Sequence, residues 1–370
     1  MNPRSPQHTI ENLINIVGKQ HVLTDDKDTR LYRQGRRYGA GKVLAVVAPG
    51  SLLEQWQVLQ AAVDADCIVI MQAANTGLTG GSTPFGDDYD RPVVLISTRR
   101  LVGIQVINDG QQVICLPGAT LDRLEKELVP FNREPHSVIG SSCIGASVLG
   151  GVCNNSGGAL VRRGPAYTEL ALYARVNDDG QLELVNHLGV NLGETPEEIL
   201  SKLETKNYQI GDIINNSGCC ASDHRYGHDV KQVDENTPAR FNADPSRLYE
   251  ASGSAGKVCV FAVRLDTFEK IPSQVFYVGT NSHDDLTEIR RFLLKDLPRL
   301  PIAGEYIHRV AYDIGAEYGK DTFMFIEKLG TAKVPAAFAM KDKVDAYLEK
   351  FGMKGLSDKV LQLVTKFMPN

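Results

Sequence analysis

Residues 67–82 read CIVIMQAANTGLTGGS, and this stretch decides the fold. The apolar run from Cys67 to Met71 predicts a buried strand, because short apolar runs bounded by turn residues are typical of covered sheets. Three glycines follow within positions 77–81, where the backbone can turn tightly and approach another group closely. Consecutive amides of such a loop can converge on an anion. We therefore expect a strand followed by an anion-binding loop, with a plain glycine-rich surface turn as the alternative.

The surrounding sequence predicts a domain that mixes helices with strands. Val43–Ala48 is an apolar run, Pro49-Gly50-Ser51 ends it, and apolar residues from Leu52 to Val63 recur at helical spacing. A second helix is expected after Thr120. Further strands are expected at 92–97, 112–116, 173–176, 182–185, 258–265 and 274–279, and an amphipathic helix at 286–300. Residues 202–236 show no periodicity and are interpreted as a long insertion.

The length and composition limit the class of protein. A chain of 370 residues exceeds what one core usually serves, so two domains are expected. The formal net charge of -5 gives no general attraction to nucleic acid. The seven cysteines include no C-x-x-C pair, which argues against a disulfide framework and against a zinc site. No G-x-G-x-x-G follows a strand, and the P-loop spacing is absent, so other nucleotide motifs are rejected.

The chain shows no targeting or membrane-spanning signal. Residues 1–11 are polar and lack the apolar core of a secretory signal. No apolar run approaches the ~20 residues that span a bilayer. We therefore expect a protein that is cytoplasmic or attached to a membrane from the cytoplasmic side.

A second small-residue stretch runs from Gly140 to Gly158. Its small side chains would let a flat ring pass closely, and Ser141, Ser142 and Ser147 offer hydrogen bonds. A small-residue helix packed against a sheet is the alternative for this stretch alone. Two separate small-residue stretches in one domain, each after a strand, favour a large extended ligand.

Five strings together resemble a known family. ANTGLTGGSTP, REPHSVIGSSCIGASVLGGVCNNSGG (133–158) and RGPAYTE (163–169) are similar to the PCMH-type FAD-binding domain of the vanillyl-alcohol-oxidase superfamily. With TPARFNADPSRLYEASGSAGK (237–257) and AVRLDTFE (262–269), they resemble the quinone-dependent D-lactate dehydrogenases. The first glycine loop alone would indicate only the superfamily. The similarity covers essentially the whole chain and is weakest at 202–235.

The resemblance implies non-covalent FAD and an α+β fold of two subdomains, followed by the start of an α+β cap. The implied cofactor-binding residues are Ala73, Ala74, Asn75, Thr76, Gly77, Gly81 and Ser82 for the diphosphate, Gly140, Ser147 and Gly157 for the flavin and its chain, and Val260 near the adenine. The implied reaction is oxidation of D-lactate to pyruvate, by hydride transfer from C2 to flavin N5, with electrons passed to membrane quinone. The protein would orient the substrate and supply charge.

The resemblance also implies a domain plan: residues 1–269 for the FAD domain, 270–310 for the start of the cap and 311–370 for the start of a basic membrane-binding segment. Residues 328–370 carry eight lysines against four acidic residues, a net charge of +4. Lysines attract anionic phospholipid headgroups by about 1 kcal/mol each near the surface. We therefore expect peripheral attachment to the cytoplasmic face of the bacterial inner membrane. A solvated helical hairpin is the alternative, with helices expected at 344–351 and 357–367.

A 2-hydroxy acid needs a cation for its carboxylate and a base for its hydroxyl proton. The resemblance places the histidine base beyond residue 370. Candidates within the chain are Arg36 with Arg37, and Glu305, His308 and Arg309, although an ordinary surface charge is the competing interpretation for each. His136 is interpreted as structural. Two alternative functions stay open, an FAD-binding fragment without catalysis and a dehydrogenase of another D-2-hydroxy acid.

Overall fold

The computed structural model describes residues 5–35, 38–137, 145–157, 159–215, 218–236 and 244–329, with scattered residues between 333 and 360. Residues up to Ala303, apart from 139–145, belong to one compact unit, and residues 139–145 are grouped with those from Gly304 onward in a second. The first unit contains two α+β subdomains, each built on its own sheet. This confirms the predicted fold class.

The first subdomain is a four-stranded mixed sheet with the order β1-β2-β4-β3. The three strands β2, β4 and β3 are parallel, and β1 pairs with β2 in the antiparallel sense. In sheet order the strands are Val22–Leu23, Ala45–Val47, Val93–Ser97 and Ile68–Gln72. The helices of this part are α1 (Pro6–Val17), α2 (Asp26–Arg33) and α3 (Leu52–Asp64).

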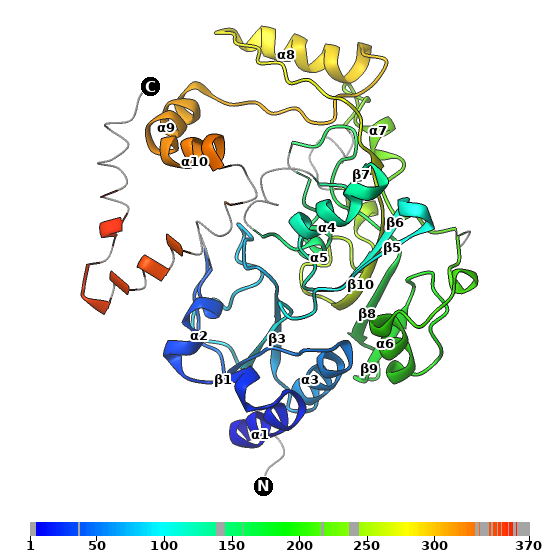
Figure 1. Cartoon of the computed structure of the whole chain (residues 1–370), viewed down its shortest axis with the longest axis vertical. Helices are drawn as coiled ribbons and strands as arrows, with labels where there is room; N and C mark the ends of the chain where they lie inside the picture. Colours follow the sequence, from blue (N-terminus) through cyan, green and yellow to red (C-terminus); the bar gives the residue numbers. More distant parts are fainter. Residues whose placement is uncertain are drawn as a thin grey trace. The chain divides into compact units, whose positions relative to one another are not determined.

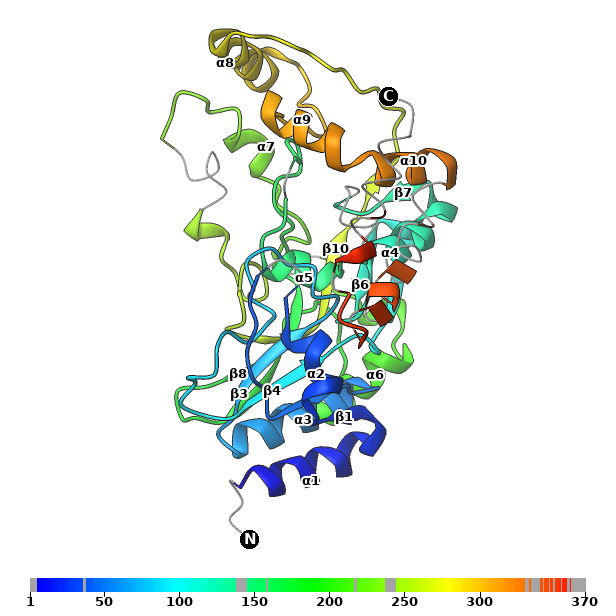
Figure 2. The same cartoon turned by 90° about the vertical axis from the view of Figure 1, so that its left-hand side faces the viewer.

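The predicted β-α-β unit around α3 is present. Ser51 caps the helix by accepting a hydrogen bond from the backbone of Glu54 at 3.1 Å. The helix then buries Leu52, Trp56 and Leu59 in the core. Figures 1 and 2 show α1 lying beside α3, and both helices contribute to this core. The N-cap and the apolar spacing of the sequence thus place β3, and the loop that follows it, where they were expected.

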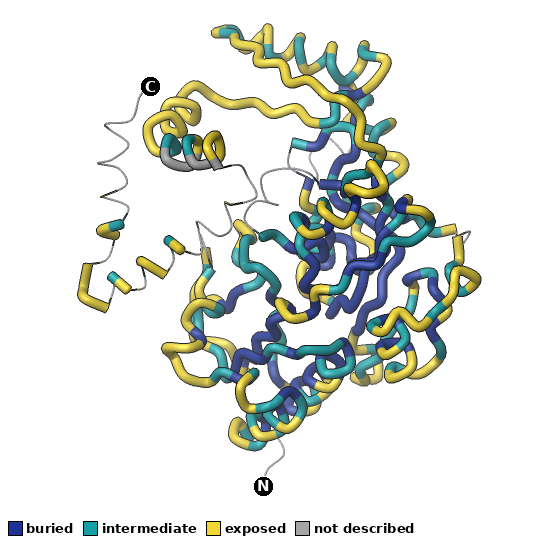
Figure 3. The backbone as a smooth tube through the Cα atoms, viewed as in Figure 1, coloured by how far each residue is buried: buried dark blue, intermediate teal, exposed yellow. Residues whose placement is uncertain are grey.

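The second subdomain is a five-stranded antiparallel sheet with the order β5-β6-β10-β8-β9. In sheet order the strands are Ile104–Ile107, Gln112–Cys115, Cys259–Asp266, Ala171–Val176 and Leu182–Asn186. The central strand β10 is buried along nearly its whole length, as the dark tube of Figure 3 shows. A register shift between Val260 and Ala262 interrupts its pairing with β8.

Helices cover the second sheet on both faces. The helices α4 (Leu121–Leu128) and α5 (Val148–Cys153) share one core cluster with Val263 of β10. The helix α6 (Pro196–Thr205) packs into the other cluster with Phe261. The rings of Trp56 on α3 and Phe261 on β10 are 6.3 Å apart, so this second cluster also joins the two subdomains.

Short elements complete the first unit. The strands β7 (Arg133–Glu134) and β11 (Phe268–Glu269) form a two-stranded sheet. Two further helices are α7 (Tyr226–Asp229) and α8 (His283–Arg291). Single helical turns of 3-10 type occupy Lys19–His21, Asn108–Gly110, Val129–Phe131, Ile210–Asp212 and Pro245–Arg247, and a π-helical turn occupies Phe292–Asp296.

Two predicted elements are wrong. No strand forms over 274–279: the segment is unpaired, and its residues Val275 to Val278 are between 66% and 94% exposed. Its apolar residues are consecutive, so a strand there would need cover on both faces, and no described segment supplies a partner. The helix predicted over 286–300 ends at the π-helical turn, because Pro298 favours an extended backbone at Leu297.

The second unit contains α9 (Arg309–Tyr318) and α10 (Lys320–Leu329). Of the helices predicted at 344–351 and 357–367, the structure describes only scattered residues. Within the described residues, no helix combines the length and the apolar character that crossing a bilayer requires.

Candidate functional site

The glycine loop begins where β3 ends, at residue 73, as the sequence predicts. Two of its residues adopt the left-handed conformation, Asn75 with φ 55° and Gly80 with φ 75°. A Cβ added to Gly80 would lie 2.8 Å from Cδ1 of Tyr38, so the ring leaves no room for a side chain. A Cβ added to Gly77, in contrast, would meet no atom within 4 Å. The loop is therefore packed at Gly80 and open at Gly77.

The polar side chains of this loop bind the protein itself. The Asn75 amide donates to the carbonyl of Gln34 at 2.9 Å, and its oxygen accepts a bond from the Ser82 hydroxyl at 3.2 Å. The sequence interpretation assigned both side chains to the cofactor. Their observed bonds hold the loop in shape and leave its backbone as the main source of donors.

The amide groups of the loop fit a diphosphate. Within the described part of the chain, no backbone N–H of residues 74–82 donates to a backbone carbonyl or a side chain. Small residues at Ala73, Ala74, Gly77 and Gly81 add little bulk beside these amides, and the space around Gly77 is open. Unpaired amides on a glycine-rich turn are the donor set that proteins use for phosphate groups. The residues of this loop thus suit a diphosphate, which is an anion of the kind that the sequence predicts here.

The second small-residue stretch lies beside the first. A Cβ on Gly81 would be 4.0 Å from the side-chain oxygen of Asn154, so the two stretches meet in space. Ser147 caps α5 by accepting from the backbone of Gly150 at 3.1 Å, and its hydroxyl hydrogen stays available as a donor. Gly140 lies outside the described residues, as do Ser141 and Ser142. The short helix α5 was the alternative interpretation, and it is present within the stretch.

Gly157 and Val260 occupy buried positions. A Cβ at Gly157 would lie 2.8 Å from Cα of Pro165, so a close backbone contact already requires glycine there. Val260 lies at the register shift of β10, where its carbonyl accepts a 3.4 Å bond from the Gln55 side chain. No described contact assigns either residue to a cofactor, and both assignments stay predictions.

The substrate-side candidates form no common site in the described residues. Arg36 and Arg37 lie outside the described residues. In the second unit, Arg309 pairs with Asp313 at 2.8 Å, and the carboxylate raises the pKa of the guanidinium. His308 Nδ1 accepts a hydrogen bond from the backbone of Val310 at 3.2 Å, so the histidine caps α9. Glu305 is exposed.

His136 is a structural residue, in agreement with its interpretation from the sequence. It is 7% exposed, and burial lowers its pKa to about 4. Its ring nitrogens contact the Ser137 hydroxyl at 3.2 Å and the carbonyl of Arg163 at 3.4 Å. The buried Arg163 donates to the carbonyls of Pro135 and His136 and pairs with Glu134. The cluster stabilises the chain on both sides of the second stretch without presenting a base.

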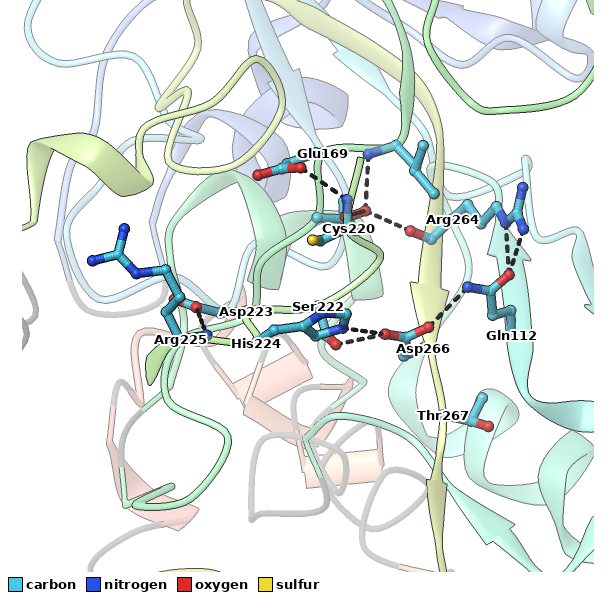
Figure 4. A network of polar contacts seen from close by, with 12 residues as sticks. Gln112, Glu169, Cys220, Ser222, Asp223, His224, Arg225, Arg264, Asp266 and Thr267 are labelled. Atoms are coloured by element: carbon cyan, nitrogen blue, oxygen red, sulfur yellow. Dashed lines mark hydrogen bonds and ion pairs between the residues drawn. The ribbon is translucent and has the colours of Figure 1, made fainter. Parts of the chain in front are cut away.

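A buried polar network was missed from the sequence (Figure 4). Arg264 of β10 is 1% exposed and donates to the side chain of Gln112 and to the carbonyls of Gly189 and Ile214. Gln112 also donates to Asp266 at 2.8 Å. Asp266 accepts from the Ser222 hydroxyl at 2.6 Å. The one available signal was an arginine inside the apolar string CVFAVRL, and the network fastens the predicted insertion to the sheet.

Two hollows in the described surface lie away from the glycine loop. A groove of about 480 Å³ runs between α1 and α3 and contains no residue of either small-residue stretch. A second cavity of about 30 Å³ is large enough for a single water. Its lining residues are Asn155, Pro165, Tyr167, Asp223, Tyr226, Asp229, Asp244 and Arg247. Neither hollow contains a residue of the glycine loop, so the loop amides remain the strongest mark of the site.

Two family models match parts of the chain. Residues 43–185 match the FAD binding domain family, and residues 275–370 match the family described as D-lactate dehydrogenase, membrane binding. The first match contains both small-residue stretches and ends within the second sheet. The chain therefore carries an FAD binding domain, and FAD is its cofactor. The second match begins in the exposed segment before α8.

Solved structures that match the chain share little of its sequence. An alkyldihydroxyacetonephosphate synthase matches 71% of the chain and 40% of its own length, with 14% identity and a TM-score of 0.46. A 4-ethylphenol oxidase from Gulosibacter chungangensis matches 72% and 43%, with 13% identity and a TM-score of 0.43.

Curated relatives are much closer in sequence. A quinone-dependent D-lactate dehydrogenase of Haemophilus influenzae is 60% identical over 99% of the chain and 65% of its own length. The enzyme of the same name from Escherichia coli is 57% identical over 98% of the chain and 64% of its own length. The chain thus spans somewhat less than two thirds of these relatives. By sequence, nearly the whole chain is similar to proteins named quinone-dependent D-lactate dehydrogenase.

Proposed function

We propose that the protein takes part in the FAD-dependent oxidation of D-lactate to pyruvate, with electrons passed to a membrane quinone. The single observation that carries the proposal is 60% identity, over 99% of the chain, to a protein named for this activity. The open amides of residues 74–82 support it, because they provide the donors that a dinucleotide requires. A related D-2-hydroxy acid would use the same chemistry and is the second candidate substrate.

We further propose how the chain would hold the cofactor without a covalent bond. The backbone amides of 74–82 would bind the diphosphate, with Ala73, Ala74, Gly77 and Gly81 keeping the approach open and the Thr76 hydroxyl adding a donor. Ser147 and Gly157 would line the flavin and its chain, and the Val260 backbone would contact the adenine. The bound cofactor supplies a two-electron acceptor, and the protein supplies orientation and charge. These assignments rest on motif position and on the donors described above.

Arg36, Glu305, His308 and Arg309 remain the candidates for substrate contacts. A carboxylate substrate would have to compete with Asp313 for Arg309, because that pair is already formed at 2.8 Å. A base at His308 would have to give up the cap of α9. Of His308 and Arg309, the arginine is the better candidate, since a guanidinium has enough N–H donors to bind two carboxylates at once.

We propose that the protein attaches to anionic phospholipid headgroups on the cytoplasmic face of the inner membrane. The support is the match of 275–370 to a membrane-binding family and the net charge of +4 over 328–370. Such attraction is electrostatic and weakens as salt screens it. Sedimentation with vesicles of phosphatidylglycerol, but not of phosphatidylcholine, should remove the protein from solution, and about 0.5 M salt should release it. Equal sedimentation with both lipids would contradict an electrostatic attachment.

The test of the catalytic proposal is a visible spectrum of the purified protein, followed by D-lactate under anaerobic conditions. Bleaching of the flavin absorbance by D-lactate, and not by L-lactate, would support the reaction. A flavin spectrum that persists would identify an FAD-binding protein that does not oxidise D-lactate. Absence of a flavin spectrum, even after incubation with FAD, would contradict the assignment of both small-residue stretches.

A further inference from the structure

The glycine loop is closed at its base by Gln72. This residue ends β3 and is 2% exposed. Its side-chain nitrogen donates to the carbonyl of Tyr32 and to the carbonyl of Ser82, both at 2.7 Å. Both N–H groups of one carboxamide are thus used to join the beginning of the loop to its end and to the last turn of α2. The Tyr32 carbonyl is one of the terminal helix carbonyls that need a partner outside the helix.

A second carboxamide, that of Asn75, fixes the loop three residues further along the chain. Asn75 takes a left-handed backbone with φ 55°, which asparagine tolerates better than most residues. Its side chain spans from the carbonyl of Gln34 to the hydroxyl of Ser82, at 2.9 and 3.2 Å. Gln72 therefore binds the Tyr32 carbonyl and Asn75 binds the Gln34 carbonyl. Two positions of the loop are thus attached to the same neighbouring segment of backbone.

We call residues 32–35 and 38–41 the strap, because they lie along the loop. The ring of Tyr38 covers Gly80 and stacks on Phe85, with ring centroids 5.8 Å apart. Gly41 pairs with Gly86 in a parallel bridge, and the amide of Gly86 donates to the carbonyl of Ala40 at 2.8 Å. The strap thus holds the loop from the end of β3 to residue 86.

These contacts separate two kinds of donor. The side-chain amides of Gln72 and Asn75 are used within the protein, whereas the backbone amides of 74–82 have no acceptor among the described residues. A loop whose shape is fixed before its ligand arrives loses less conformational entropy on binding. The arrangement keeps the unpaired amides in place without using them.

We infer that Gln72 and Asn75 are positioning residues, which pre-form the diphosphate loop by tying it to the strap and do not contact FAD. The inference rests on the proposed function, since it assumes that the loop amides bind the cofactor. It also reassigns Asn75, whose side chain the sequence had placed on the ligand. Gln72 had no assigned role.

The test is FAD binding to the apoprotein of the full chain, measured by fluorescence quenching, for the wild type and for Gln72→Glu. At pH 7.5 the introduced carboxylate has no N–H and faces two carbonyl oxygens, so affinity should fall roughly 10- to 100-fold. Gln57→Glu makes the same change at an exposed position of α3 and should leave affinity within about twofold of the wild type.

A pH profile distinguishes positioning from general damage. Protonation of the introduced carboxyl restores one O–H donor, and its burial beside carbonyl oxygens raises its pKa. Affinity of the Gln72→Glu variant relative to wild type should therefore recover several-fold between pH 7.5 and pH 5.5. A general defect of folding would show no such recovery, and urea unfolding of each apoprotein identifies it. Asn75→Asp, at a half-buried position, should weaken binding about 3- to 10-fold and provides the test if Gln72→Glu fails to fold.

Each outcome bears on one proposal. Wild-type affinity in both Gln72→Glu and Asn75→Asp would overturn the inference and leave the proposed function intact. Weakened binding without recovery at pH 5.5 would also overturn it, because the lost hydrogen bond would not be the cause. Failure of the wild type itself to bind FAD would overturn the proposed function together with the inference.

Discussion

Arg264 and Gln112 are joined across strands β10 and β6 by a 2.9 Å hydrogen bond from the guanidinium Nε to the side-chain oxygen. The same arginine donates to Gly189, Ile214 and Asn215, although it is 1% exposed and makes no ion pair with any described carboxylate. Burial lowers the pKa of Arg264. Carbonyl and side-chain amide oxygens around the guanidinium accept hydrogen bonds from it. This single side chain therefore connects the sheet to the predicted insertion at 202–236, whose described residues form no strand.

Arg264→Met is expected to lower the free energy of unfolding by about 3–5 kcal/mol, because it leaves several buried acceptors without a donor. Urea unfolding of the apoprotein measures the change. Arg175→Met removes an exposed pair with Glu183 on the same sheet and should cost less than about 1 kcal/mol. Equal costs for the two variants would show that burial of Arg264 contributes nothing.

Alanine substitutions at Gly80 and Gly77 should affect different properties of the protein. Gly80→Ala places a Cβ 2.8 Å from the Tyr38 ring at a φ of 75°, so we expect the apoprotein to lose about 1–3 kcal/mol of stability. Gly77→Ala meets no atom within 4 Å and should change stability by less than about 0.5 kcal/mol. It should nevertheless weaken FAD binding, because its methyl group enters the open side of the loop. Unchanged FAD affinity in Gly77→Ala would mean that the diphosphate does not approach this residue.

His136 should make the protein less stable in acid. Burial holds its pKa at about 4 in the folded state, below the ~6.5 of an unfolded histidine. Between these pH values the unfolded chain binds the extra proton, so stability rises with pH and is lost as pH falls from 6.5 toward 4. The effect amounts to at most about 3 kcal/mol.

Urea unfolding at pH 7.5 and pH 5 measures this slope. His136→Gln should reduce the pH dependence, because the amide can replace the contact with Arg163 without titrating. His283→Gln changes an exposed histidine at the start of α8 and should keep the wild-type dependence. A slope that survives in His136→Gln would assign the acid sensitivity to other groups.

The exposed segment before α8 should promote association. Val275, Phe276, Tyr277 and Val278 form a consecutive apolar patch, and such patches favour contacts between molecules. The double variant Phe276→Ser, Tyr277→Ser should sediment as a smaller species at high concentration, with stability within about 0.5 kcal/mol of the wild type. Loss of stability in this variant would indicate that the segment packs within its own molecule. For comparison, Phe261→Ala removes a buried ring and should lower the free energy of unfolding by about 3–5 kcal/mol.

Local signals in the sequence predicted much of the first unit. Thr120 caps α4, and the helix buries Leu121, Leu124 and Leu128 as their spacing indicates. The loop after β3 was placed correctly because an apolar strand and a glycine cluster are both short-range features. Its function needed the resemblance of several separated strings.

The remaining features depend on partners far away in the chain. Arg264 finds Gln112 from 152 residues away, and no periodicity encodes that pairing. The bonds of Gln72 to Tyr32 and Ser82 were also invisible, since a polar residue at a strand end is compatible with many partners. The segment at 274–279 has the composition of a strand, but composition cannot supply the neighbour that a strand requires.

The position of β10 also constrains how the protein is made. It is the last strand of the five-stranded sheet in the sequence, yet it lies between β6 and β8. On the ribosome, the hairpins β5-β6 and β8-β9 can each form early, but they stay separate until residue 266 has been synthesised. During that interval the inner edges of β6 and β8 expose unpaired backbone groups, which are prone to pair with other chains. Correct synthesis therefore depends on protecting two open strand edges until one late strand closes both.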